Sequence, residues 1–288
     1  ASNLKTWAAS ISARSYFPYL IKELICAVIQ PDKIRFPSGD SVWVPGVDGV
    51  VINTEESKFV PKGMSVWEVG VSTRYKEKAE DDYQKRSKVE DGGEKGLPKD
   101  GDRSKITFVF VTPHAWADKE DWIAEKKRER IWGEIVVIDG VDLIDWFELA
   151  PAVQLSFAAE LNLVPAEGLQ APEQAWRDWS FLTNPPLIEE VVMAGREDQE
   201  KELIGRLSSH PDIFTVRGDS PREALGFILS SIRRVASQEQ RQNLNARVIV
   251  ADDEKIFSRL HNLKNHIIIL KNAVAQVPGY LATRGCHV

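Results

Sequence analysis

The sequence predicts an α/β fold arranged in two domains. With 288 residues, 43% of them hydrophobic, the chain can fill two cores. Apolar runs typical of strands alternate with helical patterns over residues 1–165, and the same alternation begins again after a proline-containing stretch. We therefore expect a mixed sheet flanked by helices in 1–165, a linker in 166–180, and a second, incomplete three-layer α/β domain in 181–288.

Periodicity and turn residues predict each element of the first domain. Apolar residues spaced by about 3.6 indicate an amphipathic helix over 12–30 that ends before Pro31. The elements expected after it are two short strands around a turn within 33–44, a strand in the apolar run after Gly46, a strand at 64–72, a helix at 75–88, a mobile glycine-rich loop at 89–105, a strand at 106–112, a helix at 118–130, a strand at 135–138 and a helix at 142–161 interrupted by Pro151.

The second domain repeats the alternation of strand and helix. We expect helices at 194–207 and 221–235, strands at 213–216, 246–251 and 266–270, and a turn at 218–221.

Composition excludes several classes of protein. The formal net charge of −6 argues against a protein that holds nucleic acid by overall attraction, so any DNA contact must be local. No apolar run reaches the roughly 20 residues that span a bilayer, and no signal peptide is apparent, so we expect a cytoplasmic protein. The two cysteines form no C-x-x-C pair. The first residue, Ala1, and the abrupt end at Val288 suggest a piece of a longer polypeptide.

Two carboxylates interrupt apolar runs in which a buried strand should carry no unpaired charge. Asp48 lies in G-V-D-G-V-V and Glu68 in V-W-E-V-G, and turn residues between these runs favour two adjacent strands. Carboxylates that meet at one sheet edge can hold a divalent metal. Glu23, on the first helix, becomes a third acidic group if its turn of helix passes that edge; otherwise it lies on a solvated face.

Taken together, these motifs resemble the PD-(D/E)XK, or restriction-endonuclease-like, nuclease family, and most closely the Mrr-like effector nucleases of bacterial antiphage proteins. The resemblance covers the first 165 residues and implies that Asp48, Glu68 and the backbone carbonyl of Val69 ligate Mg²⁺, with Mn²⁺ as a substitute. It also implies a lysine that orients the attacking water. Double-stranded DNA is the implied substrate.

The chain departs from the family pattern at one position. Gly70 stands two residues after Glu68, where the family has its lysine. Lys78 on the following helix is our candidate for that role, and Lys85, seven residues later, is the second. The alternative is that these lysines balance acidic neighbours on a solvated helix.

A basic run at 126–130 offers a contact with DNA phosphates or, alternatively, an ordinary soluble helix face. Because the chain as a whole is acidic, we expect nuclease activity to depend on assembly into a homo-oligomer or a larger defence complex, in which several copies present their basic faces together.

The second domain resembles the opening of a STAND-type P-loop NTPase. A-G-R-E-D precedes a helix, and V-R-G-D-S-P-R-E-A-L stands where the phosphate loop would be, but the glycine-lysine signature of that loop is missing. Val248–Ala251 with Asp252 and Asp253 imitates a Walker B strand or, alternatively, caps the next helix. We expect the second domain to be a degenerate regulatory module.

The rival functions for the protein are a catalytically dead nuclease-fold scaffold and a nucleotide-sensing switch.

Overall fold

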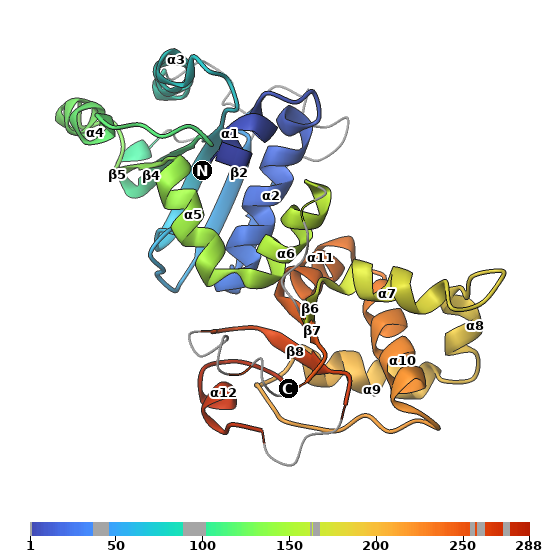
Figure 1. Ribbon diagram of the computed structural model, residues 1–288. Helices are drawn as coiled ribbons and strands as arrows, with labels where there is room; N and C mark the ends of the chain where they lie inside the picture. The colour runs from blue at the N-terminus through green and yellow to red at the C-terminus, as the bar shows by residue number, and fades with distance from the viewer. Residues whose placement is uncertain are drawn as a thin grey trace. The chain divides into compact units, whose positions relative to one another are not determined.

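The computed structural model describes residues 2–36, 46–88, 102–161, 163, 168–253, 257, 263–272 and 277–288. The chain divides into two compact units (Figure 1). Unit 1 comprises Ala1–Ile25 and Ile29–Phe147, and unit 2 comprises Cys26–Val28 and Glu148–Val288.

A five-stranded mixed sheet forms the centre of unit 1. Its strands follow one another in chain order: β1 (Lys33–Arg35), β2 (Gly49–Asn53), β3 (Gly63–Val69), β4 (Ile106–Val111) and β5 (Glu134–Ile138). The first three pair antiparallel, and β3, β4 and β5 pair parallel. The mixed sheet expected from the sequence is therefore present.

Helices cover both faces of this sheet. They are α1 (Ser2–Ala8), α2 (Ala13–Val28), α3 (Tyr75–Ser87), α4 (Lys119–Arg128) and α5 (Gly140–Leu149). Figure 1 shows α3 and α4 on one face and α2 and α5 on the other. The alternation of side chains along the strands agrees: Val66 and Phe108 pack with Ala79 and Tyr83 of α3, whereas Trp67, which points the other way, contacts Trp146 of α5.

Unit 2 contains a smaller sheet that is also covered on both faces. Its strands lie in the order β6 (Leu169–Gln170), β7 (Val248–Ala251) and β8 (Ile267–Leu270), with β6 antiparallel to β7 and β7 parallel to β8. The helices of the unit are α6 (Pro151–Glu160), α7 (Pro172–Ser180), α8 (Glu189–Met193), α9 (Glu197–Leu207), α10 (Pro221–Arg233), α11 (Gln238–Arg247) and α12 (Tyr280–Thr283). Val248 and Val250 face α7 and α10, and Ile249 and Ala251 face α6, which gives the three layers expected.

The boundary between the units differs from the one expected after residue 165. It falls between Phe147 and Glu148, so α6 belongs to unit 2. The expected linker contains β6 and α7, and Ala175 and Trp176 lie in the core of unit 2. Its proline and polar residues resemble those of a linker, but Pro172 is the first residue of a helix whose apolar face is buried.

Two further expectations in unit 2 need correction. Residues 213–216 form no assigned strand, although Phe214 donates a backbone hydrogen bond of 3.0 Å to Val288 and Val288 donates one of 3.1 Å to Asp212. The polar helix α11 was not expected, because its sequence has little hydrophobic periodicity. The turn and the second short strand expected after β1 within 33–44, and most of the expected loop at 89–105, lie outside the described residues. Among the helices that are described, none combines the length and the apolar character that crossing a bilayer requires.

Candidate active site

Asp48 and Glu68 lie side by side at one edge of the sheet. Gly49 pairs with Trp67 in the antiparallel β2–β3 ladder, so one step further along the register sets Asp48 opposite Glu68. Residues directly opposite each other project from the same face. The carboxylate of Asp48 also accepts a hydrogen bond of 2.9 Å from the backbone N–H of Val69.

The glycines that flank Asp48 have separate structural reasons. Gly46 has a φ of +148°, which side-chain-bearing residues rarely adopt, and its carbonyl accepts a hydrogen bond from Arg86. A Cβ atom at Gly49 would lie 2.4 Å from the ring of Phe36. The G-V-D-G sequence therefore fits the backbone around Asp48 to its neighbours.

Helix α3 faces the two carboxylates with a stripe of charged residues. Lys78, Asp82 and Arg86 are spaced by four, which places them on one side of the helix. Lys78 is ion-paired with Asp82, and Arg86 is ion-paired with Glu68. Only 8% of the surface of Asp82, 3% of Arg86 and 1% of Glu68 is exposed. Sequence reasoning missed Asp82; its spacing from Lys78 and Arg86 was the signal available.

The electrostatics of the cluster favour an additional positive charge. Burial raises the pKa of Glu68 well above its usual value, the carboxylates of Asp48 and Asp82 raise it further, and Arg86 only partly opposes them. Burial likewise raises the pKa of Asp82, although Lys78 acts in the opposite direction. Among the described residues, the cluster thus brings three acidic groups together with two basic ones.

Lys78 lies where a side chain at position 70 would project. A Cβ atom at Gly70 would be 3.1 Å from Cγ and 3.8 Å from Cε of Lys78. The side chain of Lys78 on α3 thus passes over the glycine at the position where the resemblance led us to expect a lysine. Lys85 is exposed on the same helix. Of the two candidate lysines, Lys78 is the one whose contact with Gly70 places it at the site.

Glu23 lies apart from this cluster. Its helix, α2, covers the face of the sheet opposite to α3 (Figure 1). Burial raises the pKa of Glu23 to about 7, and the side chains that lower it, Tyr19 and Lys22, belong to its own helix. The carboxylate is buried rather than solvated, because its turn of α2 faces the protein interior.

The donors at the sheet edge fit a magnesium ion. Within the described ranges there is no group of three or more His, Cys, Asp or Glu side chains that could hold a metal. Mg²⁺, however, is usually bound through one or two carboxylates and keeps several waters. Asp48 and Glu68, with the carbonyl of Val69, are oxygen donors of this kind, and the excess of acidic over basic groups among the described residues favours a cation there.

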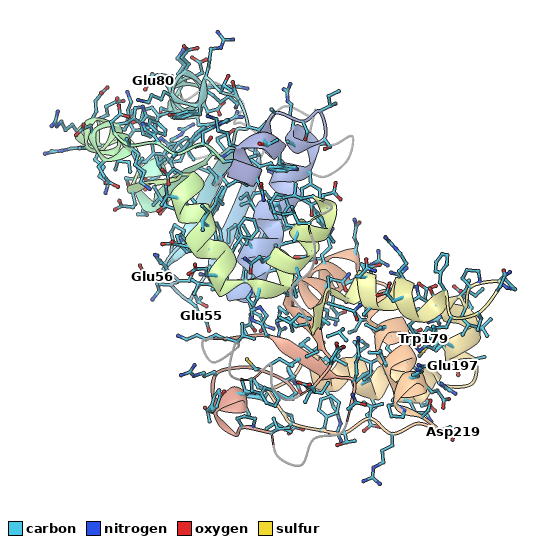
Figure 2. The ribbon with its side chains drawn as sticks, viewed as in Figure 1. Glu55, Glu56, Glu80, Trp179, Glu197 and Asp219 are labelled. Carbon is cyan, nitrogen blue, oxygen red and sulfur yellow. The ribbon has the colours of Figure 1, made fainter. Side chains whose placement is uncertain are left out.

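Two lysines of the basic run at 126–130 are already paired with acidic side chains. The ammonium group of Lys126 is buried and contacts Glu80, Glu125 and Glu129, and Lys127 is ion-paired with Glu134. Figure 2 labels Glu80 on α3. These acidic partners neutralise the two lysines, so the alternative of an ordinary helix face describes Lys126 and Lys127, whereas Arg128 and Arg130 are exposed.

Unit 2 has a pocket of about 460 Å³ beside the start of α10. It is lined in part by Arg196, Arg206, Arg217 and the loop at 218–219. The carboxylate of Glu223 accepts a hydrogen bond of 2.8 Å from the backbone N–H of Asp219 and is ion-paired with Arg196. A side-chain carboxylate thus binds a loop N–H of the kind that contacts phosphate in a P-loop.

Strand β7, whose sequence imitates a Walker B strand, does not lie beside the stretch that leads into the loop at 218–221. Asp252 follows β7, and β8 lies between β7 and the segment at 287–288 that pairs with residues 212–214. Lys271 is ion-paired with Asp252 at 2.7 Å. β8 and the segment at 287–288 therefore lie between β7, which Asp252 follows, and the strand-like stretch at 212–214 that precedes the loop at 218–221.

Comparison with known proteins gives no match: no family model, no curated protein and no solved structure resembles the chain significantly.

Proposed function

We propose that unit 1 is a metal-dependent endonuclease that hydrolyses phosphodiester bonds in double-stranded DNA. The observation that carries the proposal is the convergence of Asp48 and Glu68 at the sheet edge, with Lys78 lying over Gly70. Paired carboxylates beside an ammonium group are what metal-assisted phosphodiester hydrolysis requires.

Each residue has a defined role in this proposal. Asp48, Glu68 and the carbonyl of Val69 would hold Mg²⁺ or Mn²⁺, which supplies Lewis-acid activation of the phosphate and lowers the pKa of a bound water. Lys78 donates hydrogen bonds that orient the attacking water and stabilise the charge developing on the phosphate. Asp82 positions the ammonium group of Lys78 through their ion pair.

The proposal extends to the assembly of the protein, the role of unit 2 and the location in the cell. A net charge of −6 repels DNA, which supports activity that depends on assembly, as in an effector of bacterial antiphage defence. Unit 2 would act as a degenerate regulatory module, and Glu223 on the loop amide argues against a phosphate in that position. A cytoplasmic location stays a prediction.

A plasmid-cleavage assay tests the proposal. Supercoiled DNA is incubated with the protein and Mg²⁺ or Mn²⁺ over a range of protein concentrations, beside D48A and E68A. The matched control is E56A, which removes an exposed acid from the connection between β2 and β3, at the opposite end of these strands (Figure 2). We expect nicking by the wild type and E56A and its loss in D48A and E68A. Equal cleavage by all four proteins would show that the activity does not come from this site.

The rival function, a nuclease fold that serves only as a scaffold, is favoured by one observation. Arg86 already occupies Glu68 and the carbonyl of Gly46. Wild-type protein that binds DNA without cleaving it, at every metal and protein concentration, would favour that function.

A further inference from the structure

Arg86 connects the two chain segments that carry the proposed metal ligands. Its Nε donates a hydrogen bond to Oε1 of Glu68, at the end of β3, and its Nη2 donates one to the carbonyl of Gly46, two residues before Asp48. Arg86 thus binds oxygens of the same two segments to which a metal at Asp48 and Glu68 would bind.

A buried pair of this kind is not explained by stability alone. Removing two ions from water costs several kcal/mol each, and well-packed apolar residues often replace such a pair without loss of stability. Asp48 and Asp82 also leave the cluster with more acidic than basic groups among the residues described. The guanidinium group therefore compensates part of a charge that a divalent ion would compensate more fully.

We propose that Arg86 is an internal counter-ion that holds the carboxylates together in the metal-free protein and releases Glu68 when a divalent cation binds. This inference depends on the proposed function, because it concerns the same site. It predicts that the apparent metal affinity is proportional to the fraction of molecules in which Glu68 is free of Arg86, so that pairing with Arg86 weakens metal binding.

The position of Arg86 on α3 links metal binding to the proposed catalytic lysine. Lys78, Asp82 and Arg86 lie on one side of a single helix, and Asp82 is the ion-pair partner of Lys78. Release of Arg86 frees the C-terminal turn of α3 from Glu68 and the carbonyl of Gly46. Metal binding would then loosen α3 at the end opposite to Lys78, which gives the site a resting state and a loaded state.

Mn²⁺ titration without DNA tests the inference. Binding is measured by calorimetry and by the Mn²⁺ paramagnetic signal for wild type, R86M and D48A; methionine keeps much of the length of arginine and removes its charge. We expect R86M to bind Mn²⁺ at least tenfold more tightly than wild type, and D48A to lose binding. Equal or weaker binding by R86M, with wild type still binding, overturns the inference and leaves the proposed function intact. Absence of binding to both wild type and R86M overturns the proposed function as well.

A second measurement uses only the wild type, in case R86M folds poorly. Amide hydrogen exchange is followed in α3 with and without Mg²⁺. Release of Arg86 should speed exchange in the last turn of α3, while exchange in α4 serves as the internal reference. Unchanged or slower exchange in that turn, under conditions in which metal binds, contradicts the inference.

Discussion

Glu23 carries a buried carboxyl group on the face of the sheet opposite the candidate site. Only 6% of its surface is exposed, and Oε2 has no hydrogen-bond partner among the described residues. Such a group costs free energy whenever it is ionised. Burial raises its pKa to about 7, above the usual 4.5, so the folded protein binds this proton more tightly than the unfolded chain does.

The E23Q variant should therefore stabilise the protein at neutral and alkaline pH. The contribution of Glu23 to stability is fully present below pH 4.5 and is lost as pH rises through about 7. The difference corresponds to on the order of 3 kcal/mol in the free energy of unfolding. Urea unfolding of wild type and E23Q at pH 8 and pH 5 measures it. If the difference in the free energy of unfolding between E23Q and wild type is as large at pH 5 as at pH 8, the raised pKa of Glu23 is contradicted.

Lys78 permits a test in which the lysine is moved within the site. If the lysine acts in the proposed reaction, K78A should lower the DNA cleavage rate by about 10²- to 10³-fold, the range for removal of one preorganised hydrogen-bond donor that stabilises developing charge. The double variant K78A/G70K should recover part of that loss, because removal of the Lys78 side chain opens the space beside Gly70. K85A is the control and should cleave like wild type. If K78A/G70K binds Mn²⁺ like wild type but cleaves DNA no faster than K78A, a lysine at position 70 cannot replace Lys78, which would contradict the prediction.

At the scale of elements, two helices of unit 2 pack closely because of one glycine. A Cβ atom at Gly226, in α10, would lie 2.2 Å from the ring of Trp179, in α7. That ring, labelled in Figure 2, belongs to a side chain that is stacked on Trp176 and donates a hydrogen bond of 2.7 Å to the carbonyl of Arg222. The indole therefore cannot easily move aside.

The G226A variant should accordingly destabilise unit 2. Overpacking costs about 1–3 kcal/mol, which outweighs the helix propensity of roughly 1 kcal/mol that alanine gains over glycine. The matched control is G205A in α9, where a Cβ atom would contact no described atom within 4 Å apart from the backbone of its own helix. G205A should stabilise by about 0.5–1 kcal/mol. Thermal unfolding of both variants measures the difference; similar shifts in the same direction would refute the packing argument.

Considered as a whole molecule, the chain carries buried groups whose pH dependence differs between the units. The pKa of His266 in unit 2 is lowered from the usual 6.5 to about 4, chiefly by burial and also by the positive charge of Arg247, while its hydrogen bond to the backbone of Lys264 partly opposes them. The unfolded chain therefore takes up this proton first as the pH falls. The contribution of His266 to stability is complete above pH 6.5 and is lost as pH falls through about 4. Glu23 in unit 1 has the opposite dependence.

Between pH 7 and pH 5 the two units should thus respond in opposite directions at these positions. Amide exchange in β7 and β8 should become faster at pH 5, after correction for the intrinsic rate, by an amount that H266Q removes. Exchange in α2 should become slower, by an amount that E23Q removes. If H266Q and E23Q show the same changes in amide exchange between pH 7 and pH 5 as wild type, other groups govern the pH dependence.

Local pattern determined most of the elements. The apolar spacing before Pro31, the apolar strand that became β4 and the turn residues between β2 and β3 each depend on neighbours in sequence, so they could be read before folding. The acids Asp48 and Glu68 were also visible, because carboxylates are rare in apolar strands. The turn residues between them favoured adjacent strands, and the register of β2 and β3 then sets the two acids opposite each other.

Tertiary structure decided how the remaining residues act. The burial of Asp82, the pairing of Arg86 with Glu68 and the contact of Lys78 with Gly70 depend on how α3 packs against the sheet, which helix periodicity alone does not fix. The separation of Glu23 from the site depends on which face α2 covers. The sequence by itself determined which side chains are available and which segments pair locally. The packing of helices on a sheet, set by contacts between residues far apart in the chain, decided which of those side chains meet.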